Sequence, residues 1–157
     1  MLETTHEDWY FITLSSLIFF LALFISIYDF LVVQKANYGI VNVIGLVLFL
    51  IGLYIRLSGK HALGKYYSRG LRTLKDHELV KKGFYKYIRH PIYLSSIIYG
   101  LGVPLFFSSV YGFLIMLLII PLIFYRIKIE ENMLLEEFGD EYQEYIKQTK
   151  KLIPYLY

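Results

Sequence analysis

Residues 77–93 read HELVKKGFYKYIRHPIY, and the rest of the chain is best interpreted outward from this stretch. It is crowded with polar and basic groups, yet apolar runs long enough to enter a bilayer lie on both sides of it. Proline is favoured at the first position of a helix, because its missing N–H would be unpaired there anyway. The triplet Arg89-His90-Pro91 therefore predicts a membrane helix that begins near Pro91, with His90 at the N-cap. Such a helix start suits an anionic ligand group, while a loop that only anchors lipid headgroups is the alternative interpretation.

The composition places the chain in the membrane class. Of its 157 residues, 57% are hydrophobic and 18% are aromatic, which is too apolar for an ordinary soluble domain of this size. The sequence contains no cysteine, so disulfides, thiolate metal sites and cysteine nucleophiles are excluded. No histidine pair has the spacing or partners of a metal site. The net charge of +3 comes from basic residues beside apolar runs, which favours a membrane face over a nucleic acid as partner.

The apolar runs predict an all-α integral membrane fold with about four transmembrane helices. The first two runs are each long enough to cross a hydrocarbon core of ~30 Å. The run after Pro91 is too long for one helix, and Pro104 with the Ser108-Ser109 pair predicts a helical hairpin. One span followed by a re-entrant arm is the alternative. The expected helices cover about residues 11–33, 40–57, 91–107 and 110–125.

Charge sets the expected topology. The polar segment 58–89 carries nine lysines and arginines against only Asp76 and Glu78, so the positive-inside rule places it in the cytoplasm. Two spans precede this segment and a hairpin follows it, so both termini should also be cytoplasmic. Asp29, near the end of the first span, should reach the interface or pair inside the bundle. Gly45 and Gly52 lie seven residues apart and share a helix face where two helices could approach closely.

The tail from Arg126 onward, RIKIEENMLLEEFGDEYQEYIKQTKKLIP, should continue the last membrane helix into the cytoplasm. On a helical wheel Glu131 falls in the middle of an apolar stripe, while Arg126 and Glu130 are i,i+4 neighbours at its edge. A carboxylate on an apolar face is costly unless a cation meets it. Two interpretations stay open: a salt bridge to a basic loop residue, or a pair of acids that faces a cationic ligand while Arg126 faces an anionic one.

These two motifs together resemble the isoprenylcysteine carboxyl methyltransferase family, and related phospholipid methyltransferases share the pattern. The signature runs His-x-Leu-Val, Gly-x-Tyr, Arg-His-Pro-x-Tyr, then Arg, a Glu-Glu pair, Phe-Gly and Tyr. All of these occur here in that order and at close to the family spacing. The resemblance covers about residues 60–154, whereas residues 1–57 match only generically. The chain is short for the family, many of whose members have extra N-terminal membrane helices.

The resemblance implies one integral membrane methyltransferase domain over residues 1–157, with its cofactor region at 58–93 and 126–154. S-adenosylmethionine would be the cofactor and S-adenosylhomocysteine the product. Arg126 and Glu131 would be the catalytic residues, with Arg126 holding the carboxylate of the methyl acceptor. Two members of the cofactor set, Glu78 and Ile92, would act through backbone or packing. The cofactor-binding residues implied are His77, Glu78, Leu79, Val80, Tyr85, His90, Pro91, Ile92, Tyr93 and Glu130.

Methyl transfer is an in-line displacement that depends on alignment more than on acid–base groups. A carboxylate acceptor needs no general base, whereas an amine or a thiol would need one, with Glu131 or His90 as the candidates. The acceptor would be a membrane lipid or a prenylated or otherwise lipophilic small molecule that enters sideways from the bilayer. The alternatives are an NADPH-dependent reductase of the sterol-reductase kind and a non-catalytic ligand-binding protein. The Glu-Glu pair disfavours the reductase because it would repel the phosphates of a dinucleotide.

Overall fold

The computed structural model describes residues 6–34, 36–67 and 79–153. These residues form helices and one isolated parallel bridge between Ile88 and Lys150, which confirms the expected all-α fold. The elements are α1 (His6–Tyr28), a π-helical turn η1 (Asp29–Val33), α2 (Ile40–Leu63), η2 (Gly64–Tyr66), η3 (Gly83–Lys86), α3 (Pro91–Phe106), α4 (Val110–Leu117), α5 (Ile119–Phe138) and α6 (Asp140–Gln148).

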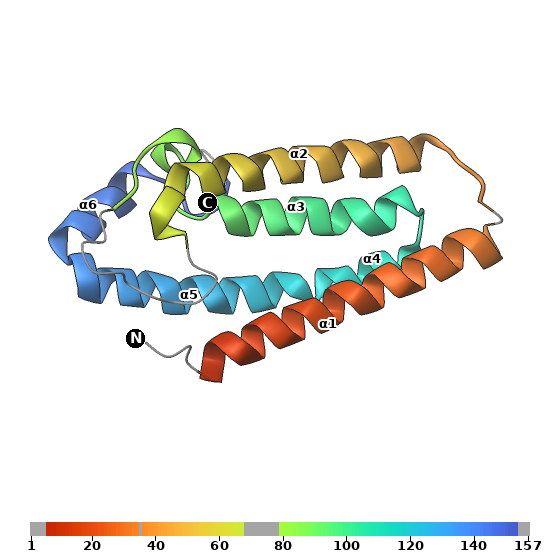
Figure 1. The fold of residues 1–157 in the computed structure, drawn as a ribbon, viewed down its shortest axis with the longest axis horizontal. Coiled ribbons are helices and arrows are strands. Elements are labelled where there is room, and N and C mark those ends of the chain that lie inside the picture. The colour runs from red at the N-terminus through yellow and green to blue at the C-terminus, as the bar shows by residue number, and fades with distance from the viewer. Residues whose placement is uncertain (1–5, 35, 68–78, 154–157) are drawn as a thin grey trace.

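The long helices lie roughly side by side in an elongated bundle (Figure 1). Helix α2 packs along α3, and α1 packs along α4, while α4 and α5 together form one nearly continuous rod. The start of α1, the start of α3 and helix α6 all lie at the same end of this bundle. The two distant sequence motifs are therefore brought together at that end.

Within the described ranges, three helical stretches are long and apolar enough to cross a membrane: Asp8–Val33, Ile40–Leu63 and Val110–Phe138. Helix α3 is apolar but has only 16 residues, a rise of about 24 Å at 1.5 Å per residue. The chain reverses after Phe106, and α4 begins at Val110 with the Ser109 hydroxyl accepting a hydrogen bond from the Gly112 nitrogen. The segment after Pro91 therefore forms a helical hairpin, whose first arm is shorter than a hydrocarbon core of ~30 Å.

Several helix boundaries differ from those expected. Helix α1 begins at His6 and α2 continues to Leu63, because hydropathy marks only the part of a helix that contacts lipid. The single helix expected through the tail is wrong. It ends at Phe138, where Gly139 adopts a positive φ of 51°, and α6 starts in a new direction. Glycine has no Cβ atom and adopts such a positive φ at little cost, so the chain can turn at this position.

The α2–α3 contact depends on glycine, as the spacing of Gly45 and Gly52 predicts. A Cβ atom added at Gly52 would lie 2.5 Å from the Tyr99 nitrogen, and one at Gly45 would lie 2.1 Å from the Phe106 nitrogen. The helix backbones thus approach too closely for any side chain at these positions. This packing occurs within one chain.

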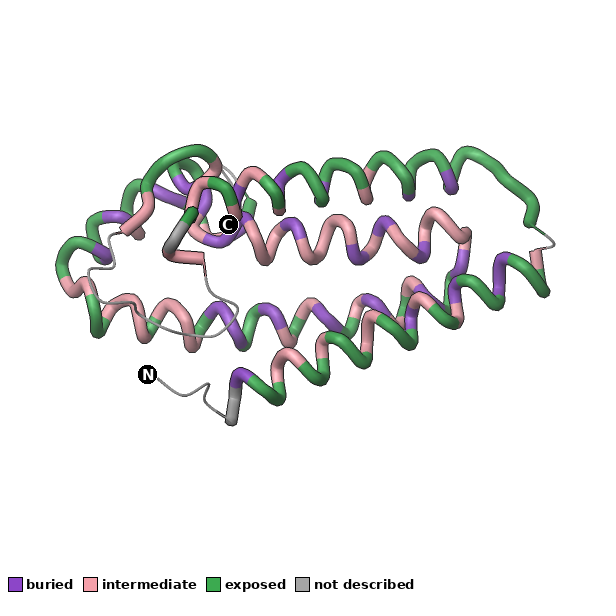
Figure 2. The backbone as a smooth tube through the Cα atoms, in the orientation of Figure 1, coloured by how far each residue is buried: buried purple, intermediate pink, exposed green. Residues whose placement is uncertain are grey.

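Burial separates the inner faces of the helices from the outer ones (Figure 2). The outer faces of α1 and α2 expose large apolar side chains such as Phe24, Leu50 and Tyr54, as lipid-facing helices do. Asp29, by contrast, is an acidic residue that lies inside the bundle. It is 7% exposed, and its Oδ2 accepts a hydrogen bond from Ser109 Oγ at 2.5 Å. This pairing confirms that Asp29 is satisfied by a partner at the hairpin turn.

Candidate active site

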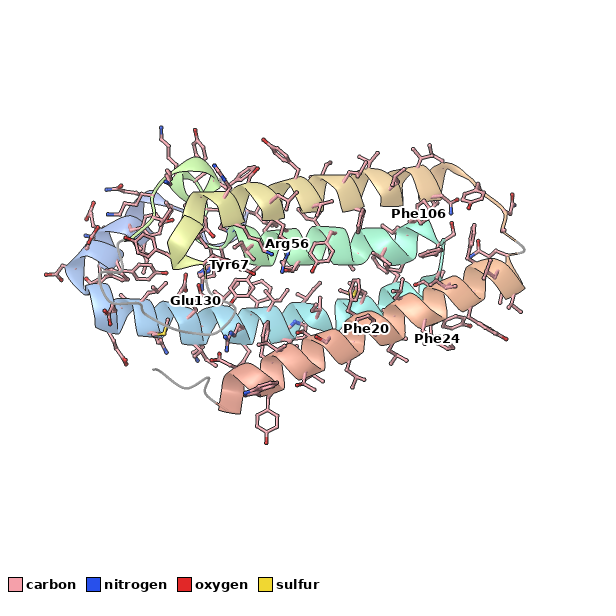
Figure 3. The ribbon with its side chains drawn as sticks, in the orientation of Figure 1. Phe20, Phe24, Arg56, Tyr67, Phe106 and Glu130 are labelled. Atoms are coloured by element: carbon pink, nitrogen blue, oxygen red, sulfur yellow. The ribbon has the colours of Figure 1, made fainter. Side chains whose placement is uncertain are left out.

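A cavity of about 480 Å³ opens between the helices at the end where the two motifs meet. Arg56 from α2 and Glu130 from α5 both face this interior space (Figure 3). Most of the expected cofactor-binding residues line the cavity, as does Arg126, which was expected to hold the acceptor. The cofactor-binding residues in the lining are Leu79, Val80, Tyr85, His90, Ile92, Tyr93 and Glu130. Pro91 is fully buried beside the cavity, and Glu131 lies behind its wall. His77 and Glu78 lie outside the described residues.

His90 occupies the N-cap of α3 and Pro91 is the first helical residue, as the sequence predicts. The chain that follows α6 returns to hold this turn in place. The Arg89 nitrogen donates to the Lys150 carbonyl at 2.8 Å, and the His90 nitrogen donates to the Lys151 carbonyl at 3.2 Å. We call Thr149, Lys150 and Lys151 the return segment. It fixes the backbone beside the cavity, and nothing in its sequence indicated that it would pair with Arg89 and His90.

Glu131 is the centre of an ion-pair cluster. Its carboxylate lies 2.9 Å from Arg89 Nε, 3.1 Å from Lys151 Nζ and 3.2 Å from His90 Nε2. Arg89 also donates from Nη1 to the Thr149 carbonyl at 2.7 Å. For Glu131 the salt-bridge interpretation therefore holds, and its carboxylate binds the loop and the return segment rather than the cavity.

Glu130 is the acid that faces the cavity. Tyr93 donates from its hydroxyl to Glu130 Oε2 at 2.6 Å, and His90 Nδ1 lies 3.9 Å from Oε1. The Glu130 side chain remains 27% exposed, and no lysine or arginine among the described residues lies within ion-pair distance of it. The carboxylate is thus held by a tyrosine hydroxyl and lies beside an imidazole, and it can meet a cationic ligand group.

Arg126 is buried, with 2% of its surface exposed, and forms an ion pair with Asp8 at the start of α1. The ring of Phe11 lies 5.0 Å from the guanidinium carbon, in cation–π geometry. The Arg126 atoms Nε and Nη1 make no hydrogen bond of ordinary geometry with a described residue. Two buried donors therefore remain beside the cavity.

Arg56 is a second cation in the cavity wall, and the sequence reasoning missed it. Its Nη1 donates to Ser96 Oγ at 3.1 Å, and its guanidinium lies 5.6 Å from the centre of the Tyr99 ring. No carboxylate among the described residues forms an ion pair with it. A signal existed, because Arg56 follows Gly52 by four residues and so shares the helix face that packs on α3.

Aromatic side chains gather at the α6 end of the cavity. Tyr145 donates from its hydroxyl to the Tyr85 carbonyl at 2.6 Å, and the rings of Tyr142 and Tyr145 lie 5.9 Å apart. Burial raises the pKa of Tyr85 and Tyr145 above the usual range, so both hydroxyls stay protonated. Flat apolar faces such as these suit a ligand ring.

Comparison with known proteins gives consistent matches. The model of the isoprenylcysteine carboxyl methyltransferase (ICMT) family matches residues 43–136. The protein-S-isoprenylcysteine O-methyltransferase of Saccharomyces cerevisiae is 34% identical over 118 residues, which cover 73% of this chain and 49% of that protein. The methanethiol S-methyltransferase 1 of Bradyrhizobium diazoefficiens is 38% identical over 96 residues, which cover 55% of this chain and 33% of that protein.

A solved structure shows the same fold. It is the eukaryotic intramembrane Ras methyltransferase ICMT, which superposes with a TM-score of 0.76 at 25% identity. The superposition covers 97% of this chain and 54% of that one. The chain spans about half the length of the fungal relatives it matches.

Proposed function

The chain belongs to the isoprenylcysteine carboxyl methyltransferase family, and from this premise we propose that it is a membrane methyltransferase that uses S-adenosylmethionine and a lipophilic carboxylate acceptor. One observation carries the proposal. A single cavity in the helix bundle presents two charges without an ion-pair partner in the part of the chain that the structure describes. Glu130 has no lysine or arginine partner there, and Arg56 has no carboxylate partner there. These are the charges that a cationic methyl donor and an anionic acceptor require.

The cavity fits the donor. Its volume of about 480 Å³ falls in the ordinary range for small-molecule sites. Glu130 would face the ammonium or sulfonium charge, with Tyr93 and His90 holding its carboxylate in place. The aromatic end at Tyr85 and Tyr145 would receive the adenine ring. When bound, S-adenosylmethionine supplies a methyl group already activated by its positive sulfur.

The other side of the cavity suits the acceptor. Apolar residues of α1, including Phe11, Phe19 and Phe20, line it beside Tyr99. A hydrocarbon chain that enters from the bilayer between helices would pack on these side chains. Its polar head would then meet Arg56 and Arg126, which can orient an anion by charge and by N–H donors.

The geometry favours a carboxylate over an amine or a thiol. A carboxylate is already nucleophilic, so no residue has to remove a proton. The two bases considered from the sequence are both engaged, because Glu131 binds Arg89, Lys151 and His90, and His90 itself lies between the two carboxylates. We therefore assign Arg126 and Arg56 to the acceptor, and we assign Glu131 to holding the Arg89-His90 turn.

The acceptor that the relatives suggest is an S-isoprenylcysteine with a free carboxylate. We also propose that the α6 end of the bundle faces the cytoplasm, because the positive-inside rule applies to the basic residues around α3 and the return segment. The donor would then enter from the aqueous side and the acceptor from the bilayer.

The test is methyl transfer by the detergent-purified protein from labelled S-adenosylmethionine to N-acetylated S-farnesylcysteine. The expected product is a methyl ester, whose label is released as methanol by mild base. If a matched amine or thiol were methylated instead, giving a product stable to base, the acceptor would be an amine or a thiol rather than a carboxylate. If the protein instead oxidised NADPH with a sterol-like acceptor and transferred no methyl group, the proposed function would be refuted.

A further inference from the structure

The N-terminal part of α1 reaches the cavity, which Phe11 lines, although the sequence suggested no role for it. Asp8 is fully buried and pairs with Arg126 Nη2. Phe11, three residues later on the same helix face, covers the guanidinium and also contacts the Tyr93 ring edge-on, with centroids 6.4 Å apart. Through these contacts α1 fixes both the position and the electrostatic environment of Arg126.

We propose that Asp8 is a positioning residue for methyl transfer: it orients Arg126 and reduces the positive charge that this arginine presents to an anionic acceptor. The inference rests on the proposed function, because it assumes that the acceptor is a carboxylate. It adds Asp8 to the residues of the proposed site. Asp8 lies 118 positions before Arg126 in the sequence and acts on the acceptor through it.

The Asp8–Arg126 pair is expected to persist when the acceptor binds. Both side chains are almost completely buried, and separating such a pair leaves an uncompensated charge in a medium of low polarity. The acceptor therefore meets a neutral pair at Arg126, with the Nε and Nη1 donors still available. The full positive charge comes from Arg56, which has no ion-pair partner among the described residues.

A moderated charge is useful because the acceptor loses its own charge during the reaction. A lone pair on the carboxylate oxygen forms the new bond to the methyl carbon. The bond between that carbon and sulfur breaks with its electron pair left on sulfur, and no proton is released. The negative charge on the carboxylate is therefore larger before the transfer than at the transition state. A second full positive charge at Arg126, added to that of Arg56, would stabilise the bound acceptor more than the transition state.

The direct test is Asp8→Asn, which keeps an oxygen acceptor for Arg126 but removes the charge. We expect KM for the acceptor and kcat each to fall about tenfold, with affinity for S-adenosylhomocysteine unchanged. Asp8→Glu, which restores the charge, should return both constants close to those of the unchanged protein. A merely structural role would not lower KM and would not require the charge.

Asp29→Asn is the matched control. Asp29, the first residue of η1, is also a buried acid, but it pairs with Ser109 far from the cavity, so its replacement should leave KM and kcat unchanged. If Asp8→Asn fails to fold, Asp8→Ser serves as a second neutral variant and must show the same paired decrease. An acceptor KM that stays constant or rises in the folded neutral variant overturns the inference.

Binding without the methyl donor separates this inference from the proposed function. The neutral Asp8 variants should bind N-acetylated S-farnesylcysteine about tenfold more tightly, and bind its methyl ester no better than the unchanged protein does. The role of Asp8 is overturned if the neutral variants gain affinity equally for the acid and the ester. It is also overturned if neither the variants nor the unchanged protein bind the acid. A lack of turnover in the unchanged protein, with acid binding and its Asp8 dependence intact, would instead refute the proposed function.

Discussion

Replacing Gly52 with alanine adds one methyl group at a close approach between α2 and α3. That Cβ atom would lie 2.5 Å from the Tyr99 nitrogen and 2.9 Å from its Cα, whereas ordinary contact begins near 3.4 Å. Because the opposing atoms belong to the backbone, α2 must move away by roughly 1 Å, and overpacking of this kind costs about 1–3 kcal/mol. Alanine recovers about 0.5–1 kcal/mol of helix propensity, so the net loss should lie between about 0 and 2.5 kcal/mol, with a middle value near 1 kcal/mol.

Gly59 is the matched position on the same helix. A Cβ atom there would lie 3.2 Å from Ile92 Cγ1, which is a side-chain carbon that can rotate away. We therefore expect Gly59→Ala to be neutral or slightly stabilising, because the gain in helix propensity is opposed by little strain. Comparing Gly52→Ala with Gly59→Ala separates the cost of backbone contact from the general effect of replacing a glycine in a helix.

The assay is thermal unfolding of both variants in the same detergent, followed by the initial rate of methyl transfer. Gly52→Ala should lower the melting temperature by several degrees. It should also lower the rate, because the hydrogen bond from Arg56 to Ser96 lies one turn beyond the contact that is forced apart. The reasoning is refuted if Gly52→Ala proves as stable as Gly59→Ala, since α2 and α3 would then not be in backbone contact.

Two further substitutions test individual residues of the site. Arg56→Gln should raise the acceptor KM about tenfold to hundredfold and leave donor affinity unchanged, because it removes the uncompensated cation; an unchanged KM in steady-state kinetics would contradict this. Glu131→Gln should destabilise the protein by about 2–3 kcal/mol, because Arg89 and Lys151 lose their shared carboxylate while they are only partly exposed. Thermal unfolding measures this cost, and equal stability of variant and unchanged protein would show that the cluster contributes little.

Local chemistry in the sequence predicted the features that depend on near neighbours. The helix start at His90 and Pro91 follows from the geometry of proline, and the close α2–α3 contact follows from Gly45 and Gly52. The need of Glu131 for a cation also followed, because its place on an apolar stripe demanded one. The break after Phe138 could have been predicted, since Gly139 is a typical helix cap.

The features that depend on distant neighbours could not be predicted. The Asp8–Arg126 pair joins residues 118 positions apart, and a short acidic N-terminus carries no local sign of such a partner. The pairing of Arg89 and His90 with the return segment depends on the direction in which α6 leaves Gly139. Sequence spacing cannot supply that direction, because it is set by packing against the rest of the bundle.

The central claim is that one cavity binds the methyl donor through Glu130. Calorimetric titration of the purified protein with S-adenosylhomocysteine tests it most directly, with NADPH as the parallel ligand. Glu130→Gln is the variant, and Glu136→Gln, an exposed acid on the same helix, is the control. We predict saturable binding that falls at least about tenfold in Glu130→Gln and is unchanged in Glu136→Gln. Binding that survives Glu130→Gln, or binding of NADPH alone, would contradict this account of the site.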